Sequence, residues 1–190
     1  MEKNLTITIT GPSGIGKGYL KRYLKNRFNL EEIVVYTTRD LREDEGSDER
    51  IWLSEEDFQC KLDNGELALV NELFGHRYAF EANYLRRLKQ RSGRFIAELY
   101  IDNVKEFRNM FPSVNMIALV TESIKFLEHR LKKRSDTDDL ISVRLKNAEF
   151  EIQKILKNKN MFNLVYMVNE NTENRVLNDI ATYIERLYIL

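Results

Sequence analysis

The sequence predicts an α/β fold in which helices flank a parallel core sheet, and three observations lead to this prediction. Residues 5–10 (LTITIT) alternate in the manner of a strand and end at a glycine. Residues 11–18 (GPSGIGKG) form a glycine-rich loop, after which apolar residues recur every fourth position at 20, 24 and 28, as on a helix. Strand-like and helical patterns then alternate through the second half of the chain, which is typical of a parallel sheet covered on both faces.

The remaining elements follow from the same patterns. Further core strands are expected at residues 33–36, 95–99, 115–120 and 164–168. Between residues 35 and 80 the rhythm changes, because the short runs IWL, LALVNEL and RYAF surround one helix that Ser54 begins, with Asp57 three residues on. We therefore expect a β-rich segment inserted at the carboxyl end of the second core strand, where α/β sheets bind their ligands.

Composition limits the classes of protein. The chain has 190 residues, 43% of them hydrophobic, which fits a single domain over residues 1–190 with a sizeable core. Lysine plus arginine and aspartate plus glutamate number 30 each, so no overall charge favours nucleic acid as a partner. Cys60 is the only cysteine, which excludes an internal disulfide. With no signal peptide or membrane span expected, these features predict a cytoplasmic protein without a membrane partner.

The loop at residues 11–18 carries most of the pattern G-x-x-x-x-G-K that binds phosphate. Gly11, Gly16 and Lys17 match it, and a predicted strand and helix flank it as the pattern requires. Backbone amides of such a loop cradle phosphate oxygens, and the lysine reaches the outer phosphates. The expected ATP-binding residues of the loop are Gly11, Pro12, Ser13, Gly14, Ile15, Gly16, Lys17 and Gly18.

The residue after the lysine departs from this pattern. A serine or threonine usually stands there, and its hydroxyl ligates Mg²⁺, whereas this chain has Gly18 followed by Tyr19. Mg²⁺ keeps several waters and relies on substrate phosphates, so the missing hydroxyl does not by itself abolish binding. Glu98, near the end of the strand expected at 95–99, is the candidate to hold one of those waters. The expected cofactors are ATP and Mg²⁺.

Seven segments in order give the chain a family resemblance: GPSGIGK, YTTRDLRE, LSEEDF, FGHRY, FLEHRLKKR, ISVRLKNAEFEI and YMVNEN. On these segments it resembles the guanylate kinase family over nearly its whole length. The resemblance implies a P-loop NTPase fold with a core at 1–34, 84–122 and 161–190. It also implies a β-rich acceptor-binding insert at 35–83 and a helical lid at 123–160.

The resemblance also assigns roles to residues. Arg39, Arg42 and Tyr78 match residues that grip the phosphate of the acceptor. Guanidinium groups suit this role because their planar forks meet phosphate with two hydrogen bonds and stay charged. The matching lid residues Arg130, Arg134 and Arg144 contact the nucleotide and the group in transfer, and Asn169 matches a residue near the adenine. The implied catalytic set is Lys17, Arg42, Arg134 and Arg144.

The acceptor pocket departs from the family. Leu69 stands where the family has a glutamate that reads guanine, and Phe80 stands where it has a serine, so both are expected to form an apolar wall of the acceptor site. Loss of hydrogen-bonding readers can reduce discrimination by roughly 10⁴-fold. YTTRD and GSDERIWLSEEDF partly resemble ribose 1,5-bisphosphate phosphokinases, and Arg50 and Arg77 add positive charge to that region.

Three functions remain open from the sequence. The first is ATP-dependent transfer of the γ-phosphoryl group to a small phosphate-bearing acceptor, by family default GMP, giving GDP and ADP. The second is the same transfer to ribose 1,5-bisphosphate. The third is a non-catalytic guanylate kinase-like module that binds phosphorylated ligands, although Lys17 and the lid arginines would serve no purpose in a pure binder.

Overall fold

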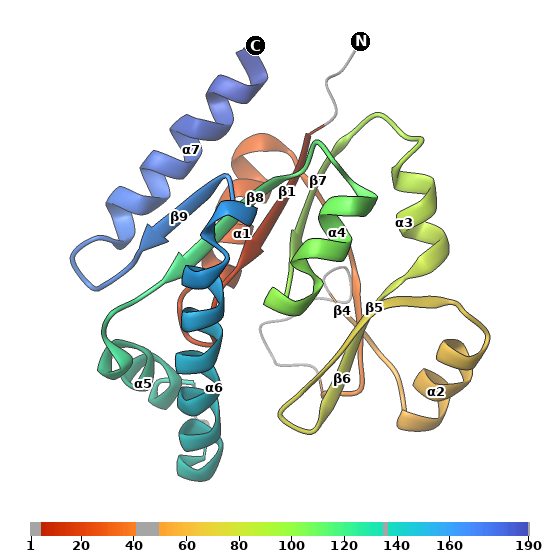
Figure 1. Cartoon of the computed structure of the whole chain (residues 1–190), viewed down its shortest axis with the longest axis horizontal. Helices are drawn as coiled ribbons and strands as arrows, with labels where there is room; N and C mark the ends of the chain where they lie inside the picture. The colour runs from red at the N-terminus through yellow and green to blue at the C-terminus, as the bar shows by residue number, and fades with distance from the viewer. Residues whose placement is uncertain (1–4, 41–49, 135–136, 190) are drawn as a thin grey trace.

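The computed structural model describes residues 5–40, 50–134 and 137–189 (Figure 1). Five strands form a core sheet in the order β2-β7-β1-β8-β9, and every pair of neighbours is parallel. The predicted α/β fold with a parallel core sheet is therefore confirmed. The strands are β2 (Glu31–Glu32), β7 (Arg94–Glu98), β1 (Leu5–Thr10), β8 (Asn115–Val120) and β9 (Leu164–Met167).

Helices cover both faces of the core sheet, as the alternating pattern predicts. Figure 1 shows α1 (Lys17–Phe28) behind the sheet, and α4 (Val104–Met110) and α6 (Asp138–Lys157) in front of it. The centre of the core is fully buried, with Ile7, Ile96 and Ile117 on adjacent strands, Leu24 on α1 and Phe107 on α4. Burial on two faces explains why these strands read as nearly continuous apolar runs.

A second sheet of four strands lies beside the core, in the order β4-β3-β6-β5. Its strands are β3 (Val35–Thr37), β4 (Arg50–Trp52), β5 (Leu67–Leu73) and β6 (His76–Glu81). On one face it packs against α2 (Glu55–Asp63) through Phe58, Leu67 and Ala79. Ser54 begins α2 as expected, because its hydroxyl accepts a 3.0 Å hydrogen bond from the Asp57 backbone amide. Helix α3 (Ala82–Leu88) then leads back to the core.

The core strand predicted at residues 33–36 is wrong. Strand β2 and the Ile33 amide, which donates to the Ile96 carbonyl at 2.9 Å, belong to the core sheet. Strand β3 pairs instead with β4 and β6 in the second sheet. The chain thus passes from one sheet to the other inside a single apolar run, and alternation along that run carries no sign of the change of partner.

A bulge in β5 links the second sheet to the core. The register with β6 shifts between Ala68 and Asn71, and Leu69 has a positive φ of 55°. Leu67 therefore packs toward α2, whereas Leu69 joins the main core. The buried side chain of Asn103, in the short 3₁₀ helix η1 (Ile101–Asn103), donates to the Leu69 carbonyl at 2.6 Å. This bond stabilises a backbone conformation that a side-chain-bearing residue rarely adopts.

The remaining helices surround the far end of the core. Helix α5 (Ile124–Lys132) begins at Ser123, and α6 begins at Thr137, each capped by a hydroxyl. The short helix η2 (Lys159–Met161) and the final helix α7 (Glu173–Ile189) complete the chain. Within the part of the chain that the structure describes, every helix is too short or too polar to span a bilayer.

Replacing Asn103 with Ala is expected to lower the free energy of unfolding by about 1–3 kcal/mol, because it removes the shorter of two hydrogen bonds to a buried carbonyl. Urea denaturation measures this change. The control is Asn64→Ala, on the exposed end of α2, with an expected change within about 0.5 kcal/mol. Equal losses in the two variants would contradict a structural role for the Asn103 bond.

Candidate active site

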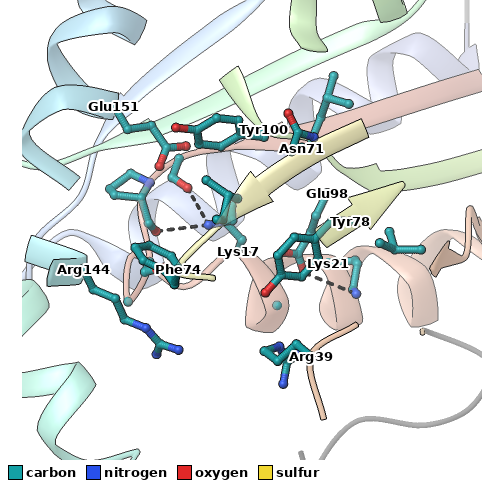
Figure 2. Close-up of a pocket in the computed structure, with 18 of the residues that line it drawn as sticks. Lys17, Lys21, Arg39, Asn71, Phe74, Tyr78, Glu98, Tyr100, Arg144 and Glu151 are labelled. Atoms are coloured by element: carbon teal, nitrogen blue, oxygen red, sulfur yellow. Dashed lines mark hydrogen bonds and ion pairs between the residues drawn. The ribbon is translucent and has the colours of Figure 1, made fainter. Parts of the chain in front are cut away.

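One cleft gathers most of the residues that the sequence singles out. It lies where β1 and β7 end, is walled by β5, β6 and α6, and has a volume of about 1010 Å³ (Figure 2). The loop residues that line it are Gly11, Pro12, Ser13, Gly14, Gly16, Lys17 and Gly18. The other predicted site residues that line it are Arg39, Leu69, Tyr78, Phe80, Glu98, Arg130, Arg134 and Arg144.

Two predicted residues lie elsewhere, and a third is outside the described part of the chain. The Ile15 side chain is 1% exposed and packs in the main core, so it anchors the loop from beneath. Asn169 lies in the turn before α7, where its Oδ1 accepts a 3.0 Å bond from the Asn171 amide, and it is not among the residues lining the cleft. Arg42 lies outside the described residues, so its predicted role in gripping the acceptor phosphate stays a prediction.

Gly11 and Gly16 show why the conformation of the loop requires glycine. Gly11 has a φ of 152°, and a Cβ there would lie 2.4 Å from the Leu119 carbonyl oxygen of β8, closer than any real contact. Gly16 has a φ of 104° and is the N-cap of α1, where its carbonyl accepts from the Leu20 amide at 3.0 Å. The loop therefore runs tightly from β1 into the start of α1, the geometry in which backbone amides bind phosphate.

Lys17 lies at the centre of the cleft. Its ammonium donates to the carbonyl of Gly11 and, at 3.1 Å, to that of Pro12 (Figure 2). Burial lowers the pKa of Lys17, the carboxylates of Glu151 and Glu98 oppose that change, and Arg134 and Arg50 add to it. The loop thus holds its lysine in place among both positive and negative neighbours.

Arg50 and Arg77, which the sequence leaves undecided, lie on opposite faces of the second sheet. Arg50 lines the cleft, and its charge acts on both Lys17 and Glu98. Arg77 points to α2, where its guanidinium lies 4.4 Å from the Phe58 ring centre and donates to Gln59 Oε1 at 2.9 Å. Arg50 therefore belongs with the site, whereas Arg77 stabilises the packing of α2.

Two arginines reach the cleft from the helices on its far side. Arg130, on α5, pairs with Glu173 at the start of α7, and its guanidinium lies 5.3 Å from the Phe126 ring centre. Arg144, on α6, is 6% exposed and lies 5.4 Å from the ring centre of Phe74 (Figure 2). Ion pairing and cation–π contact hold both guanidinium groups in defined positions.

The side of the cleft formed by the second sheet combines a polar end with an apolar wall. Arg39 and Tyr78 line the polar end (Figure 2). Val35, Leu69 and Phe80 form the wall, and each is at most 9% exposed. Leu69 and Phe80 are thus buried apolar residues that line the cleft, and their predicted role toward a base stays a prediction.

Asn71 is a polar residue on this wall that no sequence pattern indicates. It pairs directly with Tyr78 across β5 and β6, so both side chains point to the cleft face of the sheet. Its Nδ2 donates to the Leu69 carbonyl at 3.2 Å, which leaves Oδ1 as the atom that can accept a bond from a ligand. Only the bulge brings Asn71 to this place, and no motif marks a bulge in advance.

Glu98 lies at the end of β7, beside the phosphate loop. A Cβ added to Gly18 would lie 3.8 Å from its Oε1 atom, at ordinary van der Waals contact, so the carboxylate directly adjoins the loop. Burial would raise the pKa of Glu98, but the charges of Lys21, Lys17 and Arg50 outweigh it and lower the pKa to about 2. The carboxylate is therefore ionised. Because Mg²⁺ prefers oxygen ligands and keeps several waters, this carboxylate could accept a hydrogen bond from a water bound to the ion.

Lys21 and Glu151 are two further charged residues of the cleft that the sequence analysis missed. Lys21, on α1, contacts Glu32 and lies 3.3 Å from Glu98. Glu151, on α6 seven residues after Arg144, is 4% exposed and lies beside Tyr100 in Figure 2. Both lie at buried positions on helices. A charged residue within an apolar stripe of a helix is therefore the sequence feature that could indicate them.

Comparison with protein-family models matches residues 3–187 to the family described as guanylate kinase. Among curated proteins, a guanylate kinase of Thermosynechococcus vestitus is 35% identical over 149 residues, which cover 77% of this chain and 78% of that protein. A guanylate kinase of Fusobacterium nucleatum subsp. nucleatum is 27% identical over 180 residues, covering 93% of this chain and 94% of that protein.

The fold of the chain also has a solved counterpart. The crystal structure of guanylate kinase from Anaplasma phagocytophilum aligns with a TM-score of 0.72 at 21% identity, covering 100% of this chain and 88% of that chain. At this level of identity the likeness concerns the fold, and it agrees with a P-loop kinase architecture.

Replacing Glu151 with Gln is expected to stabilise the protein at neutral pH. Burial raises the pKa of Glu151 above its unfolded value, so the ionised carboxylate opposes folding once the pH exceeds the unfolded pKa. We expect the melting temperature to rise by about 2 °C or more at pH 7. The difference should vanish at acid pH, where the carboxyl is protonated in both states.

Glu149→Gln, on the exposed face of the same helix, is the matched control and should leave the melting temperature unchanged at both pH values. Differential scanning calorimetry at pH 4 and pH 7 makes the comparison. A lower melting temperature for Glu151→Gln at pH 7 would mean that attraction to Lys17 outweighs the cost of burial.

Proposed function

The chain belongs to the guanylate kinase family and is a nucleoside monophosphate kinase, and from this premise we propose that it transfers the γ-phosphoryl group of MgATP to GMP, giving ADP and GDP. One observation carries the proposal: the phosphate loop with Lys17 and the phosphate-gripping pair Arg39 and Tyr78 line the same cleft. A donor phosphate on one side and an acceptor phosphate on the other would meet within it.

The loop and Lys17 serve the donor in this proposal. Amides at the start of α1 bind the β- and γ-phosphates, and the Lys17 ammonium neutralises charge that moves toward the leaving oxygen. Because phosphoryl transfer needs little covalent chemistry from the protein, positioning and charge stabilisation supply most of the rate. The contacts of Lys17 with the Gly11 and Pro12 carbonyls hold its ammonium in place before substrates bind.

The arginines of α5 and α6 stabilise the group in transfer. Arg144 and Arg130 are already oriented by Phe74, Phe126 and Glu173, so little order is lost when they bind phosphate oxygens. Arg134 lies at the end of α5, is exposed, and lines the cleft. We assign α5 and α6 to a lid that brings these side chains onto the nucleotides.

Mg²⁺ fits the donor side through Glu98. Glu98 would hold one of the waters of the ion, and the bound ion would offset negative charge on the phosphates of ATP. The ionised carboxylate beside the position of Gly18 supports this assignment, because Mg²⁺ prefers oxygen ligands and keeps part of its water shell.

The acceptor wall supports weak discrimination among bases. Guanine presents N–H donors that need acceptors, and burying such a donor without a partner costs about 1–3 kcal/mol. Asn71 offers one neutral acceptor, whereas Val35, Leu69 and Phe80 offer none through their side chains. GMP would therefore be bound mainly by its phosphate and by burial of its base.

Arg50 favours a second candidate acceptor. Its position in the cleft adds a cation beyond Arg39 on the acceptor side, which would suit a small ligand with two phosphates, such as ribose 1,5-bisphosphate. Such an acceptor has no base to pack against the apolar wall. GMP therefore remains the proposed substrate, and ribose 1,5-bisphosphate is the alternative to test beside it.

Replacing Lys17 with Ala is expected to reduce kcat/KM by roughly 10²-fold or more, because a preorganised cation is lost from the transfer site. An ADP-release assay measures turnover, and calorimetry measures ATP binding. Lys105→Ala, on the exposed face of α4, serves as the control and should match the wild-type protein. Unchanged turnover in Lys17→Ala would contradict the donor site.

Wild-type selectivity for GMP over IMP and AMP is expected to stay below about 10²-fold in kcat/KM, since a full set of hydrogen-bonding readers is needed for 10⁴-fold or more. Asn71→Asp, which supplies a charged acceptor at the same place, should raise the GMP-to-AMP ratio. A 10⁴-fold preference for GMP over AMP in the wild-type protein would contradict the inference that the apolar wall discriminates weakly among bases. If the wild-type protein turns over ribose 1,5-bisphosphate faster than GMP, the acceptor is the bisphosphate and not GMP.

A further inference from the structure

A buried ammonium group ties the helix of the phosphate loop to two strands of the core sheet. Lys21 lies one turn beyond Lys17 on α1, and its side chain is 3% exposed. Its Nζ contacts Glu32 Oε1 on β2. It also lies 3.3 Å from Glu98 Oε1 at the end of β7, and both Lys21 and Glu98 are labelled in Figure 2. Because β2 and β7 are neighbours in the sheet, a single lysine spans both carboxylates.

The fold does not require this arrangement. Buried ion pairs often contribute little net stability, because removing two charges from water costs about as much as their attraction returns. An apolar residue at position 21 would continue the stripe formed by Leu20 and Leu24, which are 4% and 0% exposed. A lysine with two carboxylate partners at this point therefore calls for a functional explanation.

The geometry supplies one, because Lys21 and Gly18 are neighbours on one face of α1, three residues apart. The oxygen of Glu98 that Lys21 approaches, Oε1, is also the atom that lies 3.8 Å from a Cβ added at Gly18. Lys21 thus fixes a carboxylate oxygen beside the place where the loop of this chain lacks a hydroxyl.

We propose that Lys21 is a positioning residue that holds Glu98 against the phosphate loop, so that its carboxylate can bind the water shell of phosphate-bound Mg²⁺ in place of the hydroxyl missing at Gly18. The inference rests on the proposed function, because it assumes that the loop binds ATP. Lys21 acts through Glu98 and need not touch the substrate.

Lys25 provides a matched control on the same helix. It lies 3.4 Å from Glu32 Oε2, the other oxygen of that carboxylate, and its side chain is 26% exposed. Lys25→Met therefore removes a charge from the same cluster while Lys21 still holds Glu98. A purely structural role for the cluster would make Lys21→Met and Lys25→Met differ in stability without a specific change in the response to Mg²⁺.

Titration calorimetry of ATP binding with and without Mg²⁺ tests the proposal. Lys21→Met should weaken binding of ATP with Mg²⁺ by about tenfold or more, as loss of a partner that orients a metal-binding group typically does. Its affinity for ATP in EDTA should stay within about twofold of wild type, and Lys25→Met should match wild type in both conditions. Lys21→Arg should recover part of the loss. Adding Gly18→Ser to Lys21→Met should also restore binding, because it supplies the hydroxyl directly.

Each other outcome has a defined meaning. If Lys21→Met does not fold, Lys21→Met with Glu32→Gln removes the buried pair together, and Glu98→Gln in the otherwise wild-type protein removes the carboxylate charge; both should show the same loss. Wild-type affinity for ATP with Mg²⁺ in a folded Lys21→Met protein overturns the role of Lys21. Absence of ATP binding in the wild-type protein contradicts the proposed function instead.

Discussion

Repulsion among the cations of the cleft is the constraint on which the rest of the structure depends. Burial lowers the pKa of Lys17, and the nearby charges of Arg134 and Arg50 lower it further. Two like charges 4 Å apart repel by about 4 kcal/mol at an effective dielectric constant of 20. A cleft that gathers several cations must therefore also contain negative charge and carbonyl oxygens that offset this repulsion.

The core sheet supplies part of this negative charge. Glu98 ends β7, an inner strand of the sheet, and although burial opposes its ionisation, the charges of Lys21, Lys17 and Arg50 keep the carboxylate ionised. The carbonyls of Gly11 and Pro12 accept from Lys17, and Glu173 pairs with Arg130. Preorganised charge of this kind costs little reorganisation at the moment of transfer, which is the source of its catalytic value.

The sequence predicts those parts of the molecule that rest on local pattern. The strand, loop and helix at residues 5–28 are predicted correctly, because each has a local pattern. These patterns are the alternation of the strand, the spacing of the glycines and the apolar residues at every fourth position of the helix. The core strand predicted at 33–36 is wrong, because an apolar run does not indicate which sheet each of its residues joins. The positions of Lys21, Asn71 and Glu151 in the cleft could not be predicted, because they depend on contacts with distant elements.

The two ends of the proposed acceptor site differ in how firmly the fold determines them. The phosphate end depends on the loop, on arginines and on a sheet edge, and changing it would disturb the balance of charges throughout the cleft. The base end depends on the bulge in β5, where the positive φ of Leu69 turns Leu69 into the core and aligns Asn71 with Tyr78. A few substitutions at this bulge alter which hydrogen-bonding groups face the base while leaving the phosphate grip intact. In the proposed site, selectivity for the base can therefore change independently of phosphoryl transfer.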